Sequence, residues 1–164
     1  GSKLPDAQAA YETAHTHNAA MLGGVNFMLH ACGWLEGGLV SSFEKFVMDA
    51  DQLGSLHHMA QGVAFDENAQ AMDAIREVGP SGHYLGCAHT QANFKEAFWR
   101  SDLLDYKPFE TWQEEGARDT MTLASARVEY LMANYQKPPL DLAIDEALGA
   151  YIARRKAAVP DSLV

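Results

Sequence analysis

Apolar residues recur at helical spacing along most of the chain, which predicts a mainly α-helical protein with about six helices. An alanine-rich stretch predicts a first helix over residues 7–21, ended by the glycine pair at 23–24. Ser41 and Glu44 have the spacing of a capping box, so a second helix is expected from there to Gln61. Its apolar face, which we expect in the core, comprises Phe43, Phe46, Val47, Ala50, Leu53 and Ala60.

Four further helices are predicted from the same pattern of caps and apolar faces, within 66–78, 90–98, 111–135 and 141–156. Their expected capping residues are Asp66, Thr90, Thr111 and Asp141. The methionines at 121 and 132 fall on a helical stripe and are most simply core residues. The segment 100–110 is expected to be the longest irregular piece.

One short apolar run favours a strand, and a helix is an alternative of nearly equal weight. It covers Val25–Ala31, and the alternation of a strand would place Asn26, Met28 and His30 on one side. Residues 81–87 are expected to form a turn or a second short strand.

Composition narrows the class of protein. The 164 residues suffice for one domain, and a formal net charge of −10 argues against a nucleic acid partner. Two cysteines without a CxxC pair favour a reduced, cytoplasmic protein, and the longest apolar runs are too short to span a membrane. Residues 1–2, Gly-Ser, resemble an expression scar, so the chain is expected to be a fragment.

A glutamate bracketed by glycines is the first candidate for chemistry. Glu36 lies between Gly33 and the Gly37-Gly38 pair, and glycines allow the backbone to approach a ligand closely. The alternative is an ordinary glutamate in a polar loop. His30 and Asn26 have two interpretations of equal weight, either side chains at a pocket mouth or, for His30, a buried histidine satisfied by backbone groups.

The histidines and cysteine at 83–89 allow a zinc interpretation, because His83, Cys87 and His89 carry ligand types that zinc uses. A structural zinc site usually needs four ligands, and no second pair of ligands stands out. The favoured alternative to a metal is that His89 lines a pocket next to Thr90. No P-loop, GxGxxG or GxSxG motif is present, so nothing indicates nucleotide or serine-hydrolase chemistry.

Four segments together resemble the trimethylamine methyltransferase family of corrinoid-dependent amine demethylases. They are Lys3–Glu12, Cys32–Asp49, Glu77–Leu85 and His89-Thr90. The resemblance implies that residues 3–164 are the C-terminal portion of a TIM-type (β/α)8 barrel with a helical cap. It further implies a methyltransferase that moves a methyl group from a tertiary or quaternary amine to the cobalt of a corrinoid on a partner protein. A fragment of a barrel is expected to be inactive alone.

The resemblance and the residue types together suggest a site. Glu36 and His30 are the catalytic candidates, and the substrate-binding candidates are Asn26, Trp34, Tyr84 and His89. No directly bound metal or cofactor is expected; the implied partners are a corrinoid protein, a small methylated amine and a further copy of the chain. The alternative is a stand-alone helical binding or assembly domain without catalysis.

Overall fold

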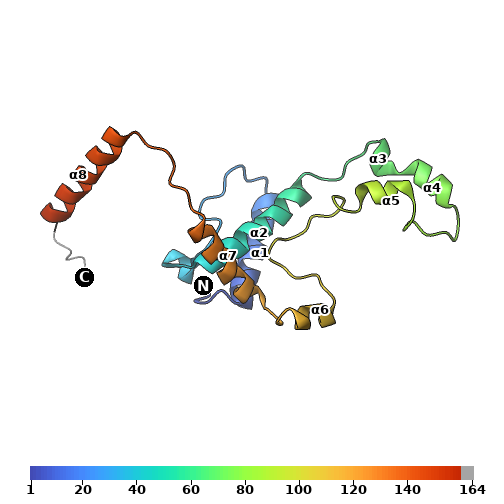
Figure 1. Cartoon of the computed structure of the whole chain (residues 1–164), viewed down its shortest axis with the longest axis horizontal. Helices are drawn as coiled ribbons and strands as arrows, with labels where there is room; N and C mark the ends of the chain where they lie inside the picture. Colours follow the sequence, from blue (N-terminus) through green and yellow to red (C-terminus); the bar gives the residue numbers. More distant parts are fainter. Residues whose placement is uncertain (160–164) are drawn as a thin grey trace. The chain divides into compact units, whose positions relative to one another are not determined.

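Short helices joined by irregular segments make up the computed structural model, which describes residues 1–159 (Figure 1). In chain order the elements are α1 (Ala7–Leu22), β1 (Trp34–Leu35), the 3-10 turn η1 (Glu36–Gly38), β2 (Val40–Ser41), α2 (Phe43–Ala60), α3 (Glu67–Gln70), α4 (Met72–Val78), α5 (Ala88–Asn93), α6 (Phe109–Glu114), α7 (Thr120–Ala133) and α8 (Leu142–Ala158). The chain divides into two compact units, residues 1–131 and a second that begins at Met132. No helix among the described residues has the length and apolar character needed to cross a membrane.

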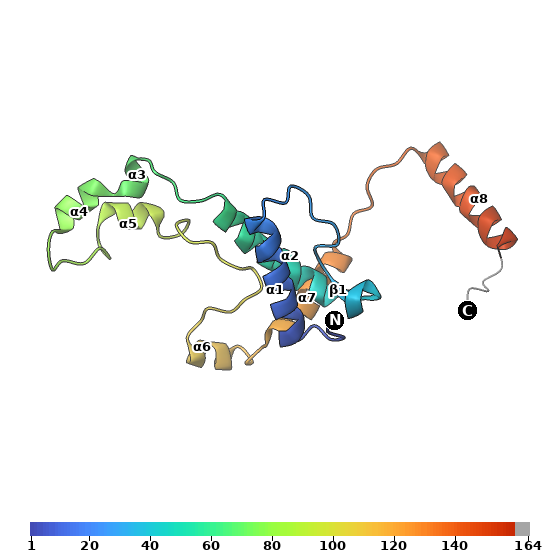
Figure 2. The same cartoon turned by 180° about the vertical axis from the view of Figure 1, so that it is seen from behind.

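The pair α1 and α2 forms the centre of the first unit, and the two helices lie side by side in both views (Figures 1 and 2). Asp6 caps α1, since its side chain accepts a hydrogen bond from the Ala9 N–H. Ser42, rather than the expected Ser41, caps α2 by accepting from the Lys45 N–H. The predicted glycine stop is confirmed, because α2 ends at Ala60 and Gly62 follows at φ 75°.

Eight α-helices are described where six were expected, because two of the expected helices are broken. Ala71 adopts φ 52° and separates α3 from α4. Gly116 and Ala117, at φ 98° and 49°, lie in the turn between α6 and α7. Positive φ is incompatible with a right-handed helix, so each break leaves two short helices in place of one. The caps Asp66 and Asp141 are confirmed, whereas Thr90 lies inside α5 and Thr111 inside α6.

The strand expected over Val25–Ala31 is wrong, because this segment is irregular. A strand must pair its backbone groups with a neighbouring strand, and the only sheet among the described residues is formed by β1 and β2. These two strands are antiparallel, with Trp34 opposite Ser41 and Leu35 opposite Val40. Residues 34–41, hereafter the Glu36 hairpin, therefore form a structure that the apolar pattern did not predict.

The packing of α2 reverses the expected orientation of its faces. Lys45 and Asp49 are each only 4% exposed, while Phe43 and Phe46 are 68% and 53% exposed. The charged face can be buried because its two charges neutralise each other as an ion pair. The expected core role of the phenylalanine face is thus wrong for this chain, and Met121 and Met132 are also exposed.

The second unit contains α8, which begins at its predicted cap. The Asp141 side chain accepts hydrogen bonds from the N–H groups of Ala143 and Ile144. Lys137 forms an ion pair with Asp145 across 2.8 Å, and both side chains are largely exposed to solvent. None of the residues described for α8 is buried, so local hydrogen bonds rather than packing define this helix.

Candidate functional site

The Glu36 hairpin displays an acidic side chain at its tip. Glu36, Gly37 and Gly38 adopt φ values of 50°, 65° and 97°, so three consecutive residues lie in the left-handed region. Glycine accepts this conformation freely, but for a glutamate it is uncommon and costs about 1–3 kcal/mol. The surrounding structure holds it there, because the Glu36 N–H donates to the Ser2 carbonyl oxygen across 2.8 Å.

The carboxylate of Glu36 is available for a ligand. The residue is exposed, and among residues 1–159 no hydrogen bond or ion pair engages its side chain. The side chain of Ser2 helps to order the chain opposite it, because Ser2 is only 4% exposed and donates a hydrogen bond to Asp6. The backbone that carries the carboxylate is therefore held in place by a hydrogen bond. The carboxylate itself makes no hydrogen bond or ion pair with another described residue.

Two of the predicted site residues meet beside the hairpin. The rings of His30 and Trp34 stack edge to face, with centroids 5.3 Å apart. His30 also has a positive φ of 55° and lies in a turn shortly before the hairpin. The structure thus brings the His30 and Trp34 rings together, and Glu36 follows Trp34 by two residues in the chain. Asn26 is exposed in the irregular segment that precedes them.

The other two predicted residues belong to a different part of the first unit, the segment of α3, α4 and α5. His89 Nε2 lies 2.7 Å from the Asn68 carbonyl oxygen and borders a cavity of about 510 Å³. Tyr84 lies in the turn before α5, where its carbonyl oxygen accepts from the Cys87 N–H. Within the described part of the chain, no hydrogen bond or ring contact joins either residue to the Glu36 hairpin.

The cysteines and histidines do not gather into a metal site. Across residues 1–159, no group of three or more potential ligands could hold a metal ion, and the set His83, Cys87 and His89 is no exception. The Cys87 thiol instead lies 3.2 Å from the Thr90 hydroxyl, a hydrogen bond that lowers the pKa of the thiol. Burial raises the pKa of the Cys32 thiol, with the nearby Asp49 carboxylate adding to the effect, so Cys32 is a poor nucleophile.

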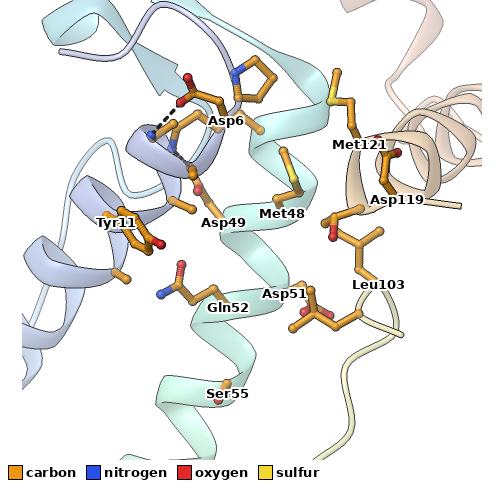
Figure 3. Close-up of a pocket in the computed structure, with 18 of the residues that line it drawn as sticks. Asp6, Tyr11, Met48, Asp49, Asp51, Gln52, Ser55, Leu103, Asp119 and Met121 are labelled. Carbon is orange, nitrogen blue, oxygen red and sulfur yellow. Dashed lines mark hydrogen bonds and ion pairs between the residues drawn. The ribbon is translucent and has the colours of Figure 1, made fainter. Parts of the chain in front are cut away.

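A larger cavity of about 880 Å³ lies between α1, α2, the segment before α6 and the start of α7 (Figure 3). Its apolar lining includes Met48, Leu103 and Met121, which Figure 3 shows on three different segments. None of the six predicted site residues lines it. Sequence reasoning missed this cavity because it assigned the opposite face of α2 to the core.

The carboxylates around this cavity are already engaged in holding the chain together. Asp51 accepts hydrogen bonds from the Ser101 hydroxyl and the Asp102 N–H. Asp119 accepts from Thr122, which lowers the pKa of the Asp119 carboxyl. Asp49 pairs with Lys45 at 2.6 Å. The cavity therefore lacks the unengaged charge that the Glu36 hairpin provides.

Comparison with known proteins shows which family the chain belongs to. The sequence model of the trimethylamine methyltransferase (MTTB) family matches residues 1–160, and the chain belongs to this family. The chain is 45% identical over 154 residues to a glycine betaine methyltransferase of Desulfitobacterium hafniense, covering 94% of the chain and 32% of that protein. It is 30% identical over 151 residues to the trimethylamine methyltransferase MttB of Methanosarcina barkeri, covering 92% of the chain and 30% of that protein.

A further MttB, from Desulfitobacterium hafniense, is 30% identical over 139 residues, which cover 85% of the chain and 28% of that relative. The chain thus spans about a third of the length of the curated relatives that it matches. The resemblance seen in the four sequence segments is confirmed at the level of the family.

Proposed function

We propose that the chain is part of a methyltransferase that moves a methyl group from a tertiary or quaternary amine to a corrinoid held by a separate partner protein. Membership of the family supports methyl transfer, and the names of the relatives include trimethylamine and glycine betaine as substrates of those proteins. In this proposal the whole protein is a cytoplasmic TIM-type barrel, and the chain supplies its C-terminal portion. The cobalt of the corrinoid would supply the nucleophile that accepts the methyl group.

The observation that carries the proposal is the exposed carboxylate of Glu36, which no hydrogen bond or ion pair engages among the described residues. A quaternary ammonium has no proton to lose, so it stays positively charged. A pocket that binds it must therefore offer negative charge or π-electron density. Glu36 supplies an unpaired negative charge, and Trp34, two residues before it, supplies a ring of the type that attracts cations most strongly. The left-handed turn displays this acid on a pinned backbone.

Each remaining residue has a subordinate place in the proposal. His30, in contact with Trp34, orients the ring and completes one wall of the cation site. Asn26, Tyr84 and His89 would contribute only if other parts of the protein close the site around them, because this chain does not bring them to the hairpin.

The exposed apolar face of α2 supports a larger assembly. Phe43 and Phe46 present large aromatic side chains to solvent, an arrangement that marks an interaction surface. We propose that the remainder of the barrel covers this face and that the intact protein is a homo-oligomer. Alone, the fragment would lack the enclosed site that methyl transfer needs, and we expect no turnover from it.

The test is a charge-neutral substitution in the intact protein. Glu36→Gln should reduce methyl transfer to the corrinoid protein by about tenfold or more, because it removes the negative charge that holds the cation. Melting temperature should stay unchanged, since the side chain has no partner among the described residues. Methyl transfer is measured with a panel of methylated amines and the purified corrinoid partner.

The matched control is Glu110→Gln, which removes an exposed acid from the first turn of α6 and should leave turnover unchanged. Equal turnover of the Glu36 and Glu110 variants would remove Glu36 from the site. A large fall in the melting temperature of the Glu36 variant would instead assign this residue a structural role.

The alternative is a helical binding or assembly domain without catalysis, favoured by the small core and the many exposed apolar side chains of this chain. This alternative predicts that the intact protein transfers no methyl group from any methylated amine. The same assay therefore decides between the two functions.

A further inference from the structure

A buried ion pair lies at the base of the Glu36 hairpin. Lys45 Nζ is 2.6 Å from Asp49 Oδ2, and the two side chains are only 5% and 6% exposed. Taking two charges out of water is costly, and an apolar pair of similar size often holds two helices equally well. Stability of the helix pair alone therefore does not explain why charged residues occupy these positions.

The same carboxylate oxygen has a second partner outside its helix. Asp49 Oδ2 accepts a hydrogen bond from the Gly33 N–H across 2.8 Å. Gly33 is the residue directly before the hairpin, and its carbonyl oxygen accepts from the Ser42 N–H directly after the hairpin, at 2.9 Å. Asp49 thus holds the N–H group of Gly33, while the carbonyl oxygen of Gly33 closes the hairpin.

Lys45 links this arrangement to the first helix. Its ammonium group donates to Asp49 and also to the Thr13 hydroxyl of α1, at 2.7 Å. One network therefore connects α1, α2 and Gly33, the residue directly before the hairpin. An apolar pair could pack between the helices, but it would offer no acceptor to the Gly33 N–H.

Gly33 cannot be replaced without disturbing this contact. Its φ of 81° lies in the left-handed region, and a Cβ there would lie 3.1 Å from the Phe46 Cβ and 3.2 Å from the Ser42 carbonyl oxygen. The backbone of the hairpin therefore approaches α2 as closely as atoms allow. Since two-residue strands have little stability of their own, the orientation of the hairpin depends on such anchors.

We infer that Asp49 is a positioning residue for Glu36. By accepting a hydrogen bond from the Gly33 N–H, Asp49 sets the orientation of the hairpin relative to α2. It thereby sets the position of the Glu36 carboxylate. The link to catalysis rests on the proposed function, whereas the link to hairpin order rests on the hydrogen bonds alone.

The experiment compares two double variants of the intact protein. Both replace Lys45 by methionine, so neither leaves an unpaired buried cation. Lys45→Met/Asp49→Asn keeps a side-chain oxygen that can accept the Gly33 N–H, whereas Lys45→Met/Asp49→Leu has no acceptor. Asparagine and leucine have similar size, so the pair isolates the hydrogen bond to Gly33.

Amide hydrogen exchange is the first readout. In the leucine variant, exchange at Gly33 and Ser42 should be about tenfold faster than in the asparagine variant, the effect expected for loss of one buried hydrogen bond. Asp51→Leu is the control, since Asp51 lies two residues further along α2 and bonds Ser101 and Asp102 instead. It should leave exchange at Gly33 and Ser42 unchanged. Equal exchange in the two double variants would overturn the inference.

Methyl transfer is the second readout. Turnover should fall by about tenfold in the leucine variant and recover in the asparagine variant, a rescue that a purely structural loss would not show. Faster exchange with equal turnover in both variants would overturn the positioning role of Asp49 in catalysis. If the unaltered protein transfers no methyl group, the proposed function fails, and exchange alone then decides whether Asp49 fixes the hairpin.

Discussion

The network around Asp49 and the helix α8 use similar local signals but differ in their surroundings. Both α2 and α8 begin at a side chain that caps the first turn, Ser42 in place of the expected Ser41 in one case and the predicted Asp141 in the other. Both regions contain a lysine–aspartate ion pair, buried at Asp49 and exposed at Asp145. The buried pair also holds a glycine of a neighbouring segment, while the exposed pair links only residues near one helix end.

This difference shows that local sequence signals suffice to form a helix. A buried side chain, by contrast, can also hold the backbone of another segment in place. A buried carboxylate has few alternative partners, so its hydrogen bonds fix the backbone that donates them. An exposed carboxylate exchanges its partner for water at little cost. The two regions therefore allow matched substitutions with different expected effects.

The largest difference is expected from removing the acid of each ion pair. Asp49→Leu leaves the Lys45 ammonium buried and unpaired, so the free energy of unfolding should fall by about 3–5 kcal/mol. Asp145→Leu removes the exposed partner of Lys137 and should change it by less than about 1 kcal/mol. Urea denaturation of the two variants provides the measurement. Losses of equal size would show that Asp49 is not buried in solution.

Alanine substitution of one glycine in each region should act in opposite directions. Gly33→Ala introduces a Cβ in a left-handed conformation against Phe46 and Ser42, and we expect a loss of about 1–3 kcal/mol. Gly149→Ala in α8 meets no atom within 4 Å and should stabilise the helix by about 0.5–1 kcal/mol. Thermal unfolding for the first and helical circular dichroism for the second measure these effects. A neutral Gly33→Ala variant would contradict the close approach of the hairpin to α2.

Removal of the helix caps should produce a smaller difference. Ser42→Ala deprives the Lys45 N–H of its acceptor and should cost about 1 kcal/mol of unfolding free energy. Asp141→Ala should cost a similar amount of helix stability, but it should appear as reduced helicity of α8, because no residue of this helix is buried. Circular dichroism with urea titration separates the two outcomes. A global loss of stability from Asp141→Ala would indicate that α8 packs against another surface.

The smallest effect concerns acid titration at the start of α1. A hydrogen bond from Gln8, together with the N-terminal ammonium group, lowers the pKa of Glu12 from 4.5 to about 2. A carboxyl whose pKa is lower in the folded state stabilises the fold above pH 4.5, and this contribution is lost as pH falls towards 2. In the 164-residue chain, which carries this ammonium group, Glu12→Gln should therefore flatten the decline of stability across this range. An unchanged pH profile in thermal unfolding would show that these contacts do not persist in solution.

The sequence by itself determined the helical character, the helix caps Asp66 and Asp141, the glycine stops and the family. These features depend on neighbours a few residues apart, such as Asp66 with Ala69 or Asp141 with Ile144, so a local pattern can predict them. The sequence also singled out the glycine-bracketed Glu36, because glycines mark positions of unusual backbone conformation.

Only the tertiary structure decided which face of α2 is buried and how Glu36 is held. The apolar pattern favoured Phe43 and Phe46 as core, but the contact with α1 buries Lys45 and Asp49, whose charges cancel each other and satisfy Thr13 and Gly33. These partners lie 16 to 32 residues away in the sequence. Hydrogen bonds across such separations depend on the path of the whole chain, and no local periodicity records them.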